Sequence, residues 1–308
     1  MPWPPGTPTP SPPRTSWRLR STRTAWHRCW RNGLRRFVRP DAGRFPYLDN
    51  RSGLRPGSLP LALSHRGFAP DGGENTMAAF ERAVGLGFGY LEIDVRASSD
   101  GVVMVFHDGD LNRVAGVGGP IAARTALDLG ALSIGGHGGI PTLEAVLVRW
   151  PRLRLNIDVK SDDCVRPFAE LVNRLGVHDR VLVASFSDRR RLAVLRLLGR
   201  PTASSAGMAV NTLVKLLAPL GLAGAVARIA RVQALQVPET YRGVRVVTGR
   251  FLRACRAGGL QVHVWTVNER TEMDRLLDLG ADGLVSDAAD VLAACMAARS
   301  AWPQGRPA

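Results

Sequence analysis

Residues 90–95 read YLEIDV, a run whose apolar side chains indicate a buried strand and which also carries two acids. Side chains alternate along a strand, so Glu92 and Asp94 project from one face and Ile93 from the other. Two neighbouring carboxylates repel each other unless a positive group lies between them. Oxygen ligands of this kind suit one divalent cation, Mg²⁺ or Ca²⁺. The stretch therefore predicts a metal site on a buried strand.

The same strand belongs to a longer alternation of strand-like and helix-like segments. We predict strands at residues 61–65, 90–95, 153–159, 181–185, 202–206, 234–237, 262–267 and 283–286. We predict helices at residues 77–86, 143–150, 165–175, 188–198, 213–231, 249–257, 269–279 and 289–297. Eight strand–helix units over about 240 residues are typical of a TIM (β/α)8 barrel. A doubly wound open sheet is the alternative, although no Gly-rich nucleotide-binding string supports it.

One further strand, predicted at residues 102–106, follows the second strand after the turn Ser98-Ser99-Asp100-Gly101. A parallel crossover needs about a dozen residues, so this gap permits only an antiparallel hairpin. The predicted fold class is therefore α/β, a TIM barrel with a short β-hairpin insertion after the second strand.

Barrel geometry gathers several polar residues at one place. Active sites of TIM barrels lie at the carboxyl ends of the strands. His65 ends the first predicted strand, Asp158 and Lys160 close the fourth, and Trp265 lies near the end of the seventh. His107 follows the hairpin strand. A metal flanked by two histidines is a hydrolytic site in outline.

Eight motifs between residues 61 and 287 resemble, in order, those of the glycerophosphodiester phosphodiesterase family. They are His65-Arg66-Gly67, Glu74-Asn75-Thr76, Glu92-Ile93-Asp94-Val95, Asp100-Gly101, His107-Asp108, Ile140-Pro141-Thr142-Leu143, Trp265-Thr266-Val267-Asn268 and Gly280-Ala281-Asp282-Gly283. The resemblance implies a TIM-barrel enzyme that hydrolyses glycerophosphodiesters, a small-molecule substrate, to sn-glycerol 3-phosphate and an alcohol with the help of a metal.

The resemblance also implies roles for the polar residues at the strand ends. His65 and His107 would be the catalytic acid and base, and each proton transfer is typically worth about 10²–10⁴-fold in rate. Arg66 and Lys160 would contact the phosphate oxygens, because a positive group stabilises the charge that a phosphodiester carries. Trp265 would form a wall of the substrate pocket, although a strand aromatic is more often part of a core.

For the metal, the resemblance implies Glu92, Asp94 and Asp158 as ligands. The family usually has Glu in a Glu-x-Lys string where this chain has Asp158, which is one methylene shorter, so the metal's identity stays open. A structural ion pair between Asp158 and Lys160 is the alternative at this position. Glu74 and Asn75 would support the site from behind, or simply shape the first loop.

The chain is predicted to comprise a basic leader, one catalytic domain at residues 59–300 and a flexible tail at residues 301–308. Residues 1–58 hold 12 Arg and 2 Asp with many prolines and tryptophans, which predicts disorder. They carry +10 of the net charge of +15, so the domain itself is only mildly basic.

Residues 15–38 of the leader mix arginines with Trp17, Trp26 and Trp30, a composition that suits peripheral contact with an anionic membrane or a solvated tail. Nucleic-acid binding is a weaker interpretation, because the domain carries an intact hydrolytic set. No export signal or spanning segment is evident, which predicts a cytoplasmic protein, with the inner membrane face as the peripheral alternative. The alternative function is phospholipase-like or lyase action on a larger lysophospholipid, giving a cyclic phosphate while the leader docks on the membrane.

Overall fold

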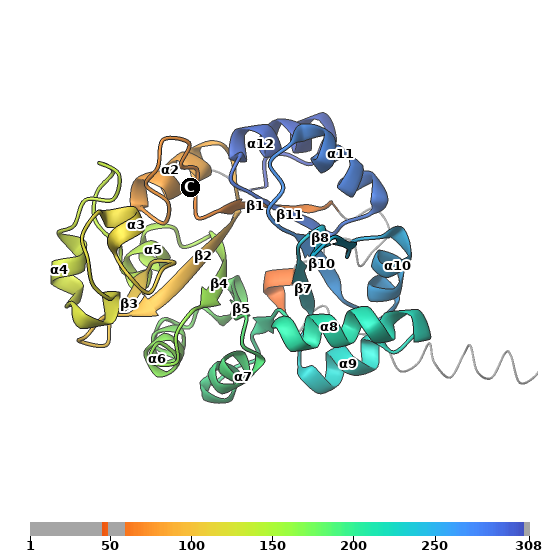
Figure 1. The fold of residues 1–308 in the computed structure, drawn as a ribbon, viewed down its shortest axis with the longest axis horizontal. Coiled ribbons are helices and arrows are strands. Elements are labelled where there is room, and N and C mark those ends of the chain that lie inside the picture. The colour runs from red at the N-terminus through yellow and green to blue at the C-terminus, as the bar shows by residue number, and fades with distance from the viewer. Residues whose placement is uncertain (1–44, 49–58, 305–308) are drawn as a thin grey trace, which may run out of the picture. The chain divides into compact units, whose positions relative to one another are not determined.

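The computed structural model describes residues 45–48 and 59–304 of the 308-residue chain (Figure 1). Eight parallel strands of this part form one sheet in the order β6-β5-β4-β2-β1-β11-β10-β7. They are β1 (Leu61–His65), β2 (Tyr90–Ala97), β4 (Arg154–Val159), β5 (Val181–Ala184), β6 (Ala203–Ser204), β7 (Ala234–Val237), β10 (Gln261–Val264) and β11 (Gly283–Ser286). A parallel bridge between Ser205 and Ala234 joins the two end strands. The predicted TIM barrel is confirmed.

Helices cover the outside of the strands, and four of them begin at a capping hydroxyl. They are α2 (Met77–Gly85), α5 (Leu143–Arg149), α6 (Val165–Leu175), α7 (Asp188–Leu197), α8 (Met208–Leu217), α9 (Ala223–Ala230), α10 (Gly249–Ala257), α11 (Arg270–Leu279) and α12 (Ala289–Ala298). The hydroxyls of Thr76, Thr142, Ser187 and Thr248 each accept a hydrogen bond from the first turn of α2, α5, α7 and α10. Such caps satisfy backbone donors that a helix start leaves open.

The helix predicted over residues 213–231 is wrong in its extent, because two helices occupy this region. α8 ends at Leu217, a 3-10 turn (η5, Ala218–Leu220) follows, and α9 starts at Ala223. Pro219 lies in that turn, and Gly221 adopts a left-handed conformation with φ of 76°. Glycine takes this conformation without steric cost, so the chain turns here between two helices.

The insertion after β2 extends well beyond a hairpin. β3 (Val103–Val105) pairs antiparallel with β2, with Val95 opposite Val105. It is followed by α3 (Asn112–Ala115), a 3-10 turn (η3, Ile121–Ala123) and α4 (Ala126–Gly130). These elements share a separate apolar cluster formed by Met104, Phe106, Leu111, Ile121, Leu129, Ile134 and Ile140. The insertion thus has its own small core, which fixes the position of His107.

Part of the predicted leader belongs to the barrel. A 3-10 turn (η2, Pro46–Leu48) packs its buried Tyr47 and Leu48 against Leu61 and Tyr90, the first residues of β1 and β2. Disorder is therefore the wrong prediction for residues 45–48, which close the amino-terminal end of the barrel. The remainder of the leader, including residues 15–38, lies outside the described residues.

The predicted flexible tail is also wrong for residues 301–304. The Trp302 indole donates to the Leu86 carbonyl at 3.0 Å and packs edge-on against Phe88. The Gln304 side chain bonds to the backbone of Pro60 and Ala62, which places it beside the start of β1. In the part of the chain that is described, no helix has the length and apolar character needed to span a membrane.

Candidate active site

A cavity of about 640 Å³ lies at the carboxyl ends of the strands and has the size of a typical small-molecule site. All eight residues to which the sequence analysis gave a catalytic, metal or substrate role line it. They are His65, Arg66, Glu92, Asp94, His107, Asp158, Lys160 and Trp265. Groups from five separate segments of the chain therefore meet in one cavity, as the barrel geometry predicts.

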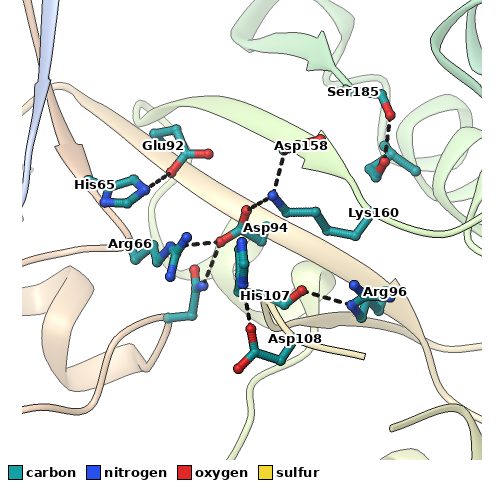
Figure 2. Close-up of polar contacts among 12 residues, drawn as sticks. His65, Arg66, Glu92, Asp94, Arg96, His107, Asp108, Asp158, Lys160 and Ser185 are labelled. Atoms are coloured by element: carbon teal, nitrogen blue, oxygen red, sulfur yellow. Dashed lines mark hydrogen bonds and ion pairs between the residues drawn. The ribbon is translucent and has the colours of Figure 1, made fainter. Parts of the chain in front are cut away.

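The three acids come from two neighbouring strands, and strand register explains why they meet. Asp94 of β2 pairs directly with Asp158 of β4. Glu92 lies two residues before Asp94, so its side chain leaves the same face of β2. Figure 2 shows the Lys160 ammonium in contact with both aspartates, with Nζ at 2.9 Å from Asp94 Oδ1 and 2.7 Å from Asp158 Oδ2. Arg66 Nε lies 3.0 Å from the other oxygen of Asp94.

Burial and charge separate the pKa values of these acids. Burial raises the pKa of Glu92, the nearby charge of Asp94 raises it further, and it reaches about 8. Burial also pushes the pKa of Asp94 upward, but Lys160 and Arg66 outweigh it and leave the pKa below its ordinary value. The pKa of Asp158 is raised, mainly by burial. The cations of the site therefore stabilise the charge of Asp94 more than the charge of its neighbours.

The acidic residues fit a divalent cation in their chemistry. Glu92 Oε2 and Asp158 Oδ1 are buried oxygens that accept no hydrogen bond. Unsatisfied buried carboxylate oxygens are costly, and a hard cation would satisfy them. Among the described residues, no three His, Cys, Asp or Glu side chains are close enough to hold an ion together as they stand. A bound ion would therefore require the carboxylates to move closer together.

His65 is held by a carboxylate that sequence analysis missed. Its Nδ1 lies 2.6 Å from Asp287 Oδ1, just beyond β11, and its Nε2 lies 3.5 Å from Glu92 Oε2. Asn268 donates to Asp287 at 3.2 Å and accepts from the Asp287 backbone N–H at 3.0 Å. Burial opposes a positive charge on His65, but Asp287 and Glu92 outweigh it and raise its pKa. Ser64 of β1 pairs with Ser286 of β11, so the residues that follow them, His65 and Asp287, lie beside each other.

His107 has a similar arrangement on the insertion side of the cavity. Its Nδ1 lies 2.6 Å from Asp108 Oδ1, and Arg113 Nε donates to the other oxygen of Asp108 at 2.5 Å. Arg113 also donates to Glu74 at 2.7 Å, and Glu74 accepts from Arg66 at 2.9 Å. Glu74 is not among the residues that line the cavity, and it links Arg66 to Arg113, which contacts Asp108 beside His107.

Asn75 supports the acids from behind. It is buried, and its side-chain amide donates to Asp94 Oδ2 at 3.1 Å. Asn75 and Arg66 both have left-handed backbones, with φ of 57° and 54°, which is uncommon for residues other than glycine. Arg66 N donates to Glu92 O, and Asn75 N donates to Arg66 O. These backbone bonds hold the first loop so that both side chains reach Asp94.

Aromatic side chains form one wall of the cavity. Trp265 is half-buried and packs edge-on against Phe186, with ring centroids 5.8 Å apart. Lys160 Nζ lies 5.3 Å from the centroid of the Phe186 ring. Phe186 was not singled out from the sequence, and its position just after β5 was the available signal. Trp265 therefore lines the cavity as predicted and also packs with a neighbouring aromatic ring.

Acids, imidazoles and cations at the carboxyl ends of an eight-stranded barrel suit hydrolytic chemistry. Residues 65–291 match the sequence profile of the glycerophosphoryl diester phosphodiesterase family. The chain belongs to this family. A Mycobacterium tuberculosis protein named "Probable glycerophosphodiester phosphodiesterase 2" is 39% identical over 247 residues, which cover 79% of this chain and 92% of that protein.

Solved structures share the fold. A glycerophosphodiester phosphodiesterase from Agrobacterium tumefaciens superposes with a TM-score of 0.65 at 24% identity, covering 77% of this chain and 99% of that one. A phosphodiesterase from Oleispira antarctica, solved in complex with the product sn-glycerol-3-phosphate, has a TM-score of 0.66 at 22% identity. That match covers 77% of this chain and 97% of the other.

Proposed function

We propose that this enzyme hydrolyses glycerophosphodiesters to sn-glycerol 3-phosphate and an alcohol, with His65 and His107 as the acid–base pair. The observation that carries the proposal is that both imidazoles line one cavity and both have Nδ1 tied to a carboxylate. A carboxylate accepts the Nδ1 proton, so Nε2 is left for the substrate. One imidazole takes a proton from the attacking hydroxyl, and the other gives one to the leaving alkoxide.

Arg66 and Lys160 are suited to bind the phosphate. Both are largely buried cations that line the cavity, and both contact Asp94. A phosphodiester is an anion, so an approaching oxygen nucleophile meets negative charge. Fixed cations in a site that partly excludes water stabilise the additional charge of the transition state. Trp265 and Phe186 would limit the space for the alcohol on one side of the cavity.

Glu92, Asp94 and Asp158 would hold one divalent cation, Mg²⁺ or Ca²⁺. The support is the donor chemistry together with the two buried oxygens that accept no hydrogen bond. A bound cation would polarise a phosphoryl oxygen. Metal binding would also compete with Lys160 for Asp94 and Asp158, which leaves the lysine free to contact the phosphate.

The comparisons favour hydrolysis over the phospholipase-like or lyase alternative. The Oleispira antarctica phosphodiesterase was solved with sn-glycerol-3-phosphate, which is the product that we propose for this enzyme. The cytoplasmic location and the contact of residues 15–38 with an anionic membrane stay predictions.

The test is a panel of glycerophosphodiesters with choline, ethanolamine, inositol or glycerol as the alcohol, each assayed with Mg²⁺, Ca²⁺ or EDTA. Phosphorus NMR of the products separates sn-glycerol 3-phosphate from a cyclic phosphate. The proposal expects the open monoester, formed only with metal present. His137→Gln, which alters a histidine outside the cavity lining, is the matched control for His65→Gln. A persistent cyclic product, or full turnover in EDTA, contradicts the proposal.

A further inference from the structure

Charge is divided unevenly around the barrel. Between residues 189 and 268, from α7 to just beyond β10, the chain has 13 Arg and Lys residues and a single acid, Glu239. This segment therefore has a formal net charge of +12. Residues 59–188 and 269–304 together have a net charge of −8. Several of these cations pair with acids of neighbouring segments, so the cations without such a pair decide where a partner of opposite charge is attracted.

Within the positive segment, two elements expose apolar side chains beside the cavity. One is α8, where Leu216 is 67% exposed, and the other is the hairpin of β8 (Thr240–Tyr241) and β9 (Val244–Arg245), where Val244 is 63% exposed. We define the rim patch as Met208 and Leu216 of α8 together with Tyr241, Arg242, Val244 and Arg245 of the hairpin. Exposed apolar residues that gather in one place usually mark a contact surface.

The two elements of the rim patch are neighbours and line one cavity. Met208, Leu216, Tyr241 and Val244 all line the same cavity as the catalytic histidines. Lys215 of α8 donates to the Val246 carbonyl just after the hairpin at 2.5 Å, which joins the two elements. Exposed side chains of the rim patch therefore also line the cavity that holds the two histidines.

The cations of the rim patch form no close ion pair with a described carboxylate, although the charge of Arg245 acts on Glu239 and Glu272. Among the described residues, no carboxylate lies within 4 Å of Arg242 or Arg245, and Arg242 only stacks near the Tyr241 ring at 5.5 Å. The same holds for Arg250, in the first turn of α10 on the strand-end side of the barrel. Most other arginines of the positive segment, such as Arg190, Arg200 and Arg256, are paired with acids.

We propose that the rim patch docks on an anionic lipid surface, so that the cavity opens toward the bilayer. Aliphatic side chains and a tyrosine enter the interface, while neighbouring arginines extend to the phosphate headgroups. A nucleic acid would use the arginines but leave Leu216 and Val244 exposed to water. A second copy of this chain would set two patches of the same charge against each other. An anionic lipid surface is the partner that contacts both the apolar side chains and the arginines.

The test measures partition of the full chain onto phosphatidylcholine vesicles with and without phosphatidylglycerol. Arg242→Glu with Arg245→Glu is expected to lower the partition coefficient on anionic vesicles by at least about 30-fold, because each basic residue near the surface contributes about 1 kcal/mol. Tyr241→Ser with Val244→Ser is expected to lower it about tenfold, with the loss persisting at high salt. The leader is present in every variant, so the differences report the rim patch alone.

Matched variants on other surfaces provide the controls. Arg152→Glu with Arg196→Glu makes the same charge change away from the cavity mouth, and Ile229→Ser removes an exposed apolar residue of α9. Both should bind as the unaltered chain does, and circular dichroism should show that every variant is folded. Equal loss in the charge control and the rim variant overturns the proposal. So does binding to duplex DNA, or self-association through the rim patch, without vesicle binding.

Discussion

The Nδ1 atom of His65 and the Oδ1 atom of Asp287 lie 2.6 Å apart, across the pairing of β1 with β11. Asp287 is in turn fixed by two hydrogen bonds with Asn268. A carboxylate that holds one ring nitrogen sets the tautomer of the imidazole and directs the other nitrogen. Asp287 is therefore a positioning residue for His65, and it acts from outside the cavity lining.

Replacement of Asp287 by Asn should lower kcat by about 10²-fold or more and leave KM nearly unchanged. Both oxygens of a carboxylate accept hydrogen bonds, whereas an amide has one accepting oxygen and one donating NH2 group. When the NH2 group faces His65, the imidazole carries its proton on Nε2 instead of Nδ1. Steady-state kinetics gives the kcat and KM values, and nitrogen NMR of the imidazole reports the tautomer. Asp290→Asn, in the first turn of α12, is the matched control. Normal kcat in Asp287→Asn would show that the contact is only structural.

Lys160→Met should lower the free energy of unfolding of the metal-free protein by about 3–5 kcal/mol. The substitution leaves the buried Asp94 and Asp158 without the cation that lies between them. Urea unfolding measures this loss, and Asp158→Asn in the same chain should restore part of it. Added Mg²⁺ or Ca²⁺ should stabilise Lys160→Met more than the unaltered protein. A double variant that is less stable than Lys160→Met would contradict this explanation.

His263 should make the fold sensitive to acid. Burial lowers the pKa of His263 to about 4, while an unfolded histidine titrates near 6.5. The unfolded chain binds the proton first, so stability is present above about pH 6.5 and is lost as the pH falls toward 4. The loss amounts to about 3 kcal/mol by pH 4. His263→Gln should flatten the dependence over this range, as unfolding in urea at several pH values would reveal.

Trp302→Ala tests whether the chain end stabilises the barrel. The indole packs on Phe88 and bonds to the Leu86 carbonyl, so its removal should cost about 3 kcal/mol. Thermal unfolding followed by circular dichroism gives the change. Gln304→Ala removes only polar bonds and should cost about 1 kcal/mol. An unchanged melting temperature in Trp302→Ala would mean that the contact does not contribute.

The strands and the cavity residues were predictable because each is encoded locally. Buried strands are short apolar runs, and the polar residues of the site stand at their ends, as with Glu92 and Asp94 in residues 90–95. Fold geometry then places those ends together without any knowledge of side-chain contacts.

Some features were missed because they depend on contacts between residues far apart in the sequence. Others were missed because the neighbouring residues favoured a different structure. Asp287 is recognisable only once Ser286 is paired with Ser64. Tyr47 lies in a polar, Arg-rich context, and its burial depends on the barrel end that it covers. Pro219 and Gly221 did mark the break between α8 and α9, but the apolar run around them favoured one continuous helix.

The central claim is that two imidazoles from separate segments act on one substrate. The most direct measurement is kcat of the metal-loaded full chain for a glycerophosphodiester, compared between His65→Gln and His107→Gln. Both variants should remain folded and lose at least about 10²-fold in kcat. Turnover at the level of the unaltered enzyme in either folded variant would contradict the account.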